Sequence, residues 1–324
     1  MQVIKMCWQI ANIFLKLLIH KLADAEDLLT KKSDAKKNIR PFSGRAVVAS
    51  AFSPRALALL NEAQQLLACL GMTPIIVHVG ERSPKNIATM EKIISESQFA
   101  SMPNVKLELQ DGDPEEVLLH VARSRRADLI IAGALPREGR LKFYWGSVGR
   151  NLARLAPCSV LLHAKPEEMP PGWNKIHHAV EYQRGWDVGV DLSARLTIMT
   201  GARELYFTHA FHIPESVLKK KKTLNAEDYK KIYGRQDHRL QKYLSMQLAW
   251  QVPYHTQSLY EKDQFPSLAF TREIRADLFV INAPKKKPGL WDRLFPNDLE
   301  QILYDLPCSI LIARKTDSIN KKTP

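Results

Sequence analysis

Cysteine is scarce in this chain, and its few cysteines are not arranged for metal binding or for disulfides. No Cys-x-x-Cys pair and no Cys/His spacing occurs among the four, so the sequence predicts neither a disulfide framework nor a zinc site. We expect buried thiols in a reducing compartment, which indicates a cytoplasmic protein. The cysteines are Cys7, Cys69, Cys158 and Cys308.

Signatures of catalysis and of membrane insertion are also missing. The sequence contains no Walker A pattern, no HExxH helix and no nucleophile elbow, so it shows no catalytic constellation. It has no uninterrupted apolar run of spanning length and no small-residue cleavage site near its start, which argues against a transmembrane span and a secretory signal. With 45% hydrophobic and 25% charged residues, the composition is that of a folded, soluble protein.

The net charge of +13 raises the question of a nucleic-acid partner. Its densest runs, Lys219–Lys222 and Lys285–Lys287, lack the interleaved aromatic residues of a base-stacking surface. We therefore expect a solvated basic face and no nucleic-acid binding.

Two short motifs occur twice at nearly the same distance. Arg126-Ala-Asp-Leu129 returns 149 residues later at Arg275, and Pro157-Cys-Ser-Val-Leu161 returns 150 residues later as Pro307-Cys-Ser-Ile-Leu311. Matching signals at an almost constant offset indicate a tandem repeat of one domain-sized unit.

Residues 1–40 precede the repeat and contain one amphipathic helix, and Asn38–Gly44, with Pro41, is the predicted linker into the first repeat. Apolar residues between Val3 and Leu22 recur at helical spacing, so residues 2–22 could dock on protein or make peripheral contact with a membrane. We place the first domain at residues 41–168, the second at 169–318, and a tail at 319–324.

Strands and helices alternate in the first repeat. Strands are predicted at Arg45–Ser50, Ile75–Val79, Val105–Leu109, Leu129–Ala132 and Ser159–His163. Helices are predicted from Ser53-Pro54 to Gly71, from Pro84 to Ser97, after Asp113-Pro114, and from Gly146-Ser147 to Ala156. This order predicts an α/β fold, with two tandem, doubly wound, open parallel sheets of five strands each, of the Rossmann-like type.

One segment of the first repeat has the character of a ligand site. Gly133 ends a strand, and Gly146-Ser147 begins a helix. In a parallel sheet both lie at the carboxyl edge, where ligands bind, and the free amides at a helix start favour an anion. A purely structural role for both glycines remains an alternative.

This segment, with the Gly-Asp-Pro-Glu-Glu helix start and the Ala-Asp-Leu-Ile strand, resembles the universal stress protein family. Nucleotide-binding members of that family carry G-x2-G-x9-G-[ST]. The resemblance covers residues 45–165 well and residues 175–315 more weakly, so the whole chain resembles a tandem universal stress protein. It implies ATP or AMP in the first domain, with no metal beyond the Mg²⁺ that accompanies a nucleotide. The implied contacts are Ala51, Val79, Ala132, Gly133, Gly146, Ser147 and Val148.

The first repeat departs from the family pattern at two positions. Ala51 stands where the family commonly has a nucleotide-binding Asp, and Pro136 stands where it has the second glycine. Pro136 lacks a backbone N–H and has a fixed φ. We expect weaker nucleotide binding than in the family pattern, because one hydrogen bond to a charged group contributes about 1.5–3 kcal/mol.

The second repeat keeps the strand signals and loses the glycines. Strands are predicted at Lys175–Tyr182, Glu204–Ile213, Tyr254–Tyr260, Leu278–Ile281 and Ser309–Ala313. Asn282 replaces Gly133, and Pro296-Asn297-Asp298 replaces Gly146-Ser147-Val148. A carboxylate at Asp298 opposes phosphate at a helix start, so we expect no nucleotide there.

The histidines do not predict a metal site. His177 and His178 are adjacent on a strand and point to opposite faces, as do His209 and His212. His78 and His209 occupy matching positions, which favours a packing role.

These features predict a non-catalytic stress-response or regulatory protein that senses an adenine nucleotide. Two alternatives remain open: a slow ATPase or phosphotransferase using the first domain, and a membrane-surface adaptor using the N-terminal helix. We also expect a protein partner or self-association. The resemblance implies that the last strands of the two domains, Ser159–His163 and Ser309–Ala313, pair within the chain.

Overall fold

The structure is a computed structural model that describes residues 44–133, 135–136, 143–144, 147–164, 166–167, 172–183, 185–213, 224–260, 265–283 and 307–315. The N-terminal helix predicted over residues 2–22, both lysine runs, Gly146 and Asp298 lie outside these residues. The domain boundaries proposed above stay predictions.

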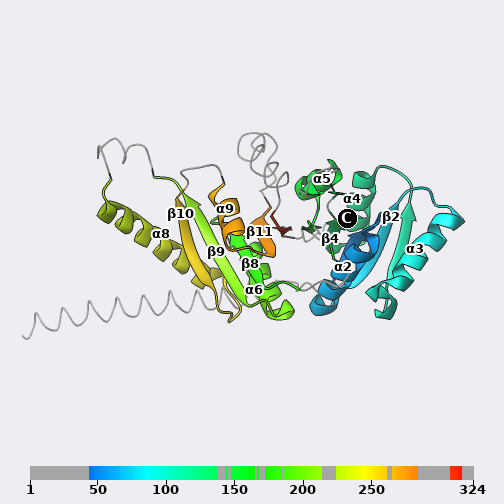
Figure 1. The fold of residues 1–324 in the computed structure, drawn as a ribbon, viewed down its shortest axis with the longest axis horizontal. Coiled ribbons are helices and arrows are strands. Elements are labelled where there is room, and N and C mark those ends of the chain that lie inside the picture. Colours follow the sequence, from blue (N-terminus) through cyan, green and yellow to red (C-terminus); the bar gives the residue numbers. More distant parts are fainter. Residues whose placement is uncertain are drawn as a thin grey trace, which may run out of the picture. The chain divides into compact units, whose positions relative to one another are not determined.

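The first half alternates strands and helices as the sequence predicts (Figure 1). Its elements are β1 (Arg45–Ala49), α2 (Ala56–Leu70), β2 (Thr73–Val79), α3 (Pro84–Glu96), the 3-10 helix η1 (Gln98–Ser101), β3 (Lys106–Gln110), α4 (Pro114–Ser124), β4 (Ala127–Gly133), β5 (Leu135–Pro136), β6 (Phe143–Tyr144), α5 (Ser147–Leu155) and β7 (Ser159–His163).

The second half repeats this order with longer helices in places. Its elements are β8 (Lys175–Ala179), α6 (Val188–Thr200), β9 (Glu204–Phe211), α8 (Ala226–Gln247), β10 (His255–Tyr260), α9 (Pro266–Glu273), β11 (Leu278–Asn282) and β12 (Ser309–Ala313). The α/β prediction is confirmed in both halves.

Local signals determine most helix ends. The Asp113 carboxylate accepts the backbone N–H groups of Glu115 and Glu116 at the start of α4, and Gly71 ends α2 with φ 63°. The helix predicted from Ser53-Pro54 instead begins at Ala56, because Ser53 and Pro54 form a turn whose Ser53 carbonyl accepts the Ala56 N–H at 3.0 Å.

The two five-stranded halves join into one ten-stranded sheet in the order β10-β9-β8-β11-β12-β7-β4-β1-β2-β3. Neighbouring strands are parallel except at the centre, where β12 pairs antiparallel with β7. This junction between the halves, called the seam below, is the strand pairing that the family resemblance implies.

The repeated Pro-Cys-Ser motif builds the seam. The Ser309 hydroxyl accepts the Ala164 backbone N–H at 3.3 Å, and the Ser159 hydroxyl accepts the Arg314 backbone N–H at 3.1 Å. These two hydrogen bonds are related by the pseudo-two-fold axis of the repeat, since each joins the serine of one copy to the residue after the last strand of the other. The cysteines beside them are buried or half-buried.

The repeated Arg-Ala-Asp-Leu motif lies beside the start of the first strand of each half, and in the first half its Asp128 carboxylate is in close contact with Gly44, just before β1. Arg126 and Arg275 adopt left-handed backbone angles, with φ 52° and 53°, where the preceding helix ends. The Asp277 carboxylate then accepts the backbone N–H groups of Asn174 and Lys175, each at 2.8 Å, at the start of β8. The motif therefore recurs because each half needs the same helix end and strand start.

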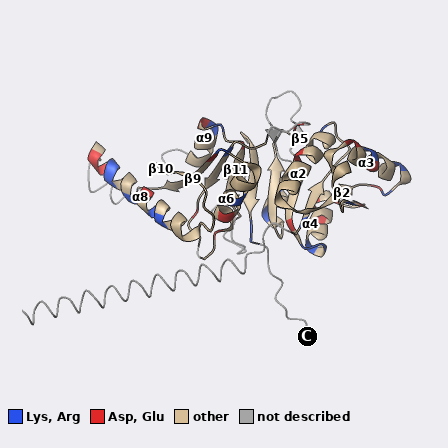
Figure 2. Ribbon diagram, turned by 90° about the horizontal axis from the view of Figure 1, so that it is seen from below, with Lys and Arg blue, Asp and Glu red and all other residues tan. Residues whose placement is uncertain are grey.

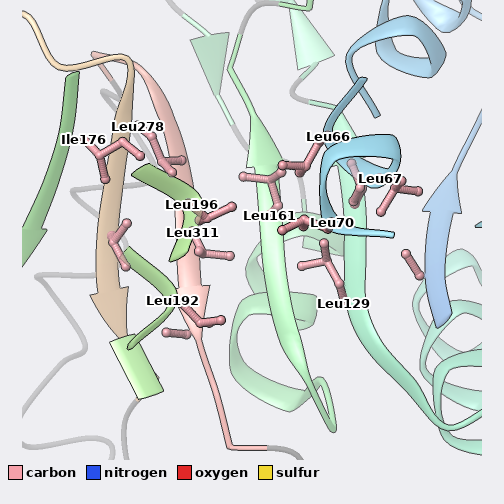
Figure 3. Packing of buried hydrophobic residues seen from close by; sticks show 14 of the residues in the cluster. Leu66, Leu67, Leu70, Leu129, Leu161, Ile176, Leu192, Leu196, Leu278 and Leu311 are labelled. Carbon is pink, nitrogen blue, oxygen red and sulfur yellow. The ribbon is translucent and has the colours of Figure 1, made fainter. Parts of the chain in front are cut away.

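Side chains alternate between the two faces of the sheet, and the core continues across the seam. On one face, α2 and α6 bury leucines against strands of both halves (Figure 3). The labelled residues there are Leu66, Leu67, Leu70, Leu129, Leu161, Ile176, Leu192, Leu196, Leu278 and Leu311. The expectation that every cysteine is buried is wrong for Cys69, which lies on the exposed face of α2.

Candidate functional site

The first half brings several of the predicted site residues to one edge of the sheet. β2, β1 and β4 are parallel neighbours, so their carboxyl ends lie at the same edge. Val79 ends β2, Gly133 ends β4, and Ala51 lies exposed just beyond β1. This is the edge at which open α/β sheets bind ligands.

Helix α5 supplies the remaining predicted residues. Ser147 is its first residue, and Val148 is partly buried against the core that includes Ala132. The first turn of α5 carries no acidic residue, so no carboxylate there opposes an anion. The Ser147 side chain and Gly146 lie outside the described residues, and their contact with phosphate stays a prediction.

A short hairpin follows β4. Its two-residue strands β5 and β6 pair Pro136 with Phe143 and Leu135 with Tyr144. The hairpin occupies the stretch between Gly133 and α5 in which the family pattern places its second glycine. Pro136 therefore stands in a strand, a position where its missing N–H and fixed φ are tolerated.

Gly133 has a packing role that the sequence alone left as an alternative. A Cβ atom at this position would lie 3.2 Å from Cδ2 of Leu59 on α2. The absence of a side chain lets the helix approach the end of β4 closely. Gly133 therefore serves the packing of α2, whatever else it contacts.

A pair of rings at this edge was missed by the sequence reasoning. Phe52 lies against His78 with a ring-centroid distance of 4.0 Å and an interplanar angle of 34°. The His78 Nδ1–H donates to the Ser50 carbonyl oxygen at 3.0 Å, which fixes the ring. His78 is buried, whereas Phe52 is 44% exposed. The matching positions of His78 and His209 in the sequence predicted that both histidines pack in the protein. They did not predict which aromatic rings the histidines would contact.

The second half contains the same pair with different surroundings. Tyr182 lies against His209 at 4.0 Å and 34°, and the His209 Nδ1–H donates to the Val180 carbonyl oxygen at 2.8 Å. Here the Arg239 guanidinium covers Tyr182 at 4.5 Å from the ring centroid, and Tyr243 meets Tyr182 edge-on at 4.9 Å. β8 ends at Ala179, three residues before the predicted end at Tyr182.

The contact between Gly133 and Leu59 is inverted in the second half. Counted from the first strand of each half, Gly189 on α6 occupies the position of Leu59. Asn282 ends β11 as Gly133 ends the equivalent strand β4. The Asn282 Oδ1 accepts the Gly189 N–H at 3.1 Å, and a Cβ at Gly189 would lie 2.5 Å from that oxygen. In the first half a helix side chain, Leu59, packs against a glycine on the strand. In the second half a strand side chain, Asn282, packs against a glycine on the helix.

A buried carboxylate lies beside Asn282 at the start of α6. Asp187 is fully buried and accepts the Val190 N–H at 3.2 Å, the Asn282 amide at 2.9 Å and the Tyr243 hydroxyl at 2.7 Å. Burial, and then the charge of Asp187, raise the pKa of the Tyr243 phenol. At this edge of the second half, the hydrogen-bonded side chains of Asp187, Asn282 and Tyr243 therefore occupy the space beside the start of α6.

The two histidines of β8 are buried and lie among core residues. His177 hydrogen-bonds to Thr271 and Thr208, each at 2.8 Å, and burial lowers its pKa to about 3. His178 lies on the opposite face, beside Gly189, and burial lowers its pKa to about 4. Within the ranges that the structure describes, no group of three His, Cys, Asp or Glu residues could hold a metal ion.

Charges of both signs are interspersed along α3, α4 and α8 (Figure 2). Some are paired along a helix, such as Lys231 with Glu227 at 2.7 Å and Lys92 with Glu96 at 3.8 Å. Among the helices in the described part of the chain, none is long and apolar enough to span a bilayer.

Comparison with known proteins gives a family match for the first half. Residues 43–163 match the Universal stress protein family. A protein of Staphylococcus epidermidis described as a universal stress protein is 38% identical over 72 residues, which is 22% of this chain and 43% of that relative. The chain therefore spans less than half the length of the curated relatives it matches.

Solved structures resemble both halves together. A protein of Pseudomonas aeruginosa UCBPP-PA14 described as a universal stress protein aligns with a TM-score of 0.58 and 18% identity, over 84% of this chain and 94% of that chain. A universal stress protein of Archaeoglobus fulgidus aligns with a TM-score of 0.53 and 14% identity, over 85% and 98%. At these identities the likeness shows the fold alone.

Proposed function

We propose that this protein is a non-catalytic stress-response protein that senses an adenine nucleotide, ATP or AMP, through its first half. The match of residues 43–163 to the Universal stress protein family supports this proposal. The second half serves as a permanent structural partner and binds no nucleotide at the matching edge.

The difference between the two carboxyl edges carries this proposal. In the second half, Asp187, Asn282 and Tyr243 are joined by hydrogen bonds of 2.7–2.9 Å, and a buried carboxylate lies at a helix start. A phosphate would have to approach that carboxylate, which is unfavourable. In the first half, Gly133 and the exposed Ala51 stand at this edge, and α5 begins without an acidic residue. Ligand binding is therefore supported in the first half only.

The same edge does not favour an ATPase or phosphotransferase. Ala51 provides no carboxylate beyond β1 to hold Mg²⁺. Without a carboxylate at this position, the edge lacks one of the metal ligands on which nucleotide hydrolysis commonly depends. We propose sensing, with the bound state read by a protein partner or by a second copy.

The proposal places the protein in the cytoplasm. Cys69, Cys158 and Cys308 are unpaired thiols, and one of them, Cys69, is exposed. An exposed free thiol is better tolerated in a reducing compartment than in an oxidising one.

Isothermal titration of ATP and of AMP, with and without Mg²⁺, tests the proposal on the wild type and on Ser147→Asp. An acidic residue in the first turn stabilises a helix, so the variant should fold, but its carboxylate should repel phosphate. Two unit charges about 4 Å apart cost about 1 kcal/mol even in bulk water, so affinity should fall at least about five-fold.

Ser101→Asp is the matched control, because it adds the same charge at the opposite edge of the same half, on an exposed residue. It should bind ATP like the wild type. Absence of saturable binding at millimolar ATP, or equal affinity in both variants, would refute the proposal. Phosphate release in the same samples would favour the ATPase alternative instead.

A further inference from the structure

The Phe52–His78 pair of the first half matches the Tyr182–His209 pair of the second half. The two pairs differ in what covers the outer face of Phe52 or Tyr182, which is the face that points away from the histidine. In both halves the inner face lies 4.0 Å from a histidine whose Nδ1 donates to the backbone. In the second half, Arg239 lies over Tyr182 at 4.5 Å. Over Phe52, among the residues that the structure describes, lies no guanidinium and no second ring, and 44% of the residue is exposed.

The cover in the second half comes from a helix that has no equal in the first half. Arg239 and Tyr243 belong to α8, which is 22 residues long, whereas α3 in the same place of the first half has 13. Ser258 on β10 donates its N–H to Asp237 at 3.0 Å, which holds α8 near the sheet. Phe52 therefore occupies the position of Tyr182, but the described part of the first half has no helix as long as α8 to place an arginine over it.

We propose that Phe52 is the surface on which the base of the bound nucleotide stacks, taking the place that the Arg239 guanidinium occupies in the second half. This inference rests on the proposed function and assigns a base-recognition residue to it. Phe52 becomes a determinant of affinity for nucleotides over simple phosphates.

The chemistry of the outer face supports a base. A guanidinium and a purine are both planar and stack on the electron-rich face of an aromatic ring. Phe52 is already held against His78, so little conformational freedom would be lost on binding. It also follows β1 directly, at the same edge as Val79 and Gly133.

The test compares Phe52→Leu and Phe52→Trp with the wild type by isothermal titration of ATP and of inorganic tripolyphosphate. Phe52→Leu keeps an apolar side chain against His78 and removes the aromatic face. It should bind ATP about ten-fold more weakly and tripolyphosphate as well as the wild type does. Phe52→Trp should restore ATP affinity, and its indole fluorescence should be quenched when ATP binds.

Tyr182→Leu is the matched control, since the equivalent ring in the second half is covered by Arg239. It should leave ATP affinity unchanged. Equal ATP affinity in wild type and Phe52→Leu, or a parallel loss for tripolyphosphate, would overturn the stacking role while the proposed function stands. A wild type that binds no ATP would overturn the proposed function, and the stacking role with it.

Discussion

The Tyr243 hydroxyl joins α8 to the buried carboxylate of Asp187, and its removal should have a measurable effect on stability. It donates to Asp187 at 2.7 Å and accepts the Gln183 backbone N–H at 3.0 Å. A hydrogen bond to a charged group contributes about 1.5–3 kcal/mol. Tyr243→Phe keeps the ring against Tyr182, and Asp187 keeps its bonds to Val190 and Asn282. We therefore expect the free energy of unfolding to fall by about 2 kcal/mol.

Urea unfolding followed by tryptophan fluorescence measures this change. Trp250 reports on the second half, because its indole N–H donates to Asp191 at 2.7 Å. With a urea slope of about 2–3 kcal/mol per molar, the midpoint should fall by about 0.7–1 M. Burial and Asp187 raise the Tyr243 pKa, so the phenol is protonated in both the folded and the unfolded state between about pH 7 and pH 9, and the stability difference should not vary with pH across that interval.

Tyr233→Phe is the control on the same helix. Tyr233 meets Phe211 edge-on at 5.2 Å, and within the described ranges its hydroxyl has no hydrogen-bond partner. Its loss should change the stability by less than about 0.5 kcal/mol. If Tyr243→Phe changed the urea midpoint no more than Tyr233→Phe did, the closure of the second half would not depend on the Asp187 hydrogen bonds.

Two further predictions concern packing and thiol reactivity. Gly133→Ala should destabilise the protein by about 1 kcal/mol in thermal melts, because its methyl group would press on buried Leu59. Gly234→Ala is the control and should be neutral or stabilising, because nothing lies within 4 Å of its new methyl group. Equal melting temperatures of the two variants would mean that the Leu59 side chain moves aside at no cost. Burial raises the pKa of the Cys158 and Cys308 thiols to about 12, so they stay protonated at pH 8, and iodoacetamide should modify exposed Cys69 far faster. Peptide mass spectrometry measures this, and equal rates would contradict the burial.

Local signals in the sequence predicted most of the fold. Asp113 and Gly71 act within a few residues of themselves, so the helix ends that they produce can be read from the chain. The repeated motifs also predicted the equivalence of the halves, since the Ser159 and Ser309 hydroxyls each accept a backbone N–H of the other half at the seam. The start of α2 was misplaced because Ser53 and Pro54 suit a turn as well as a helix start.

The candidate site was less accessible to sequence reasoning. The spacing of Gly133 placed it correctly at the carboxyl edge, but its close neighbour Leu59 lies on another element. The cover of Tyr182 by Arg239, and the bond between Tyr243 and Asp187, join residues far apart in the chain. Such contacts depend on where a long helix crosses the sheet, which no local pattern encodes.

The seam makes the partnership of the halves independent of how much protein is present. Two identical subunits would meet only above their dissociation constant, whereas β7 and β12 belong to one chain and meet at a high effective concentration. Identical subunits would also carry every substitution twice. Here Asn282 changes one edge and leaves Gly133 at the other unchanged, so one copy can keep an open edge while the other specialises in holding the pair together.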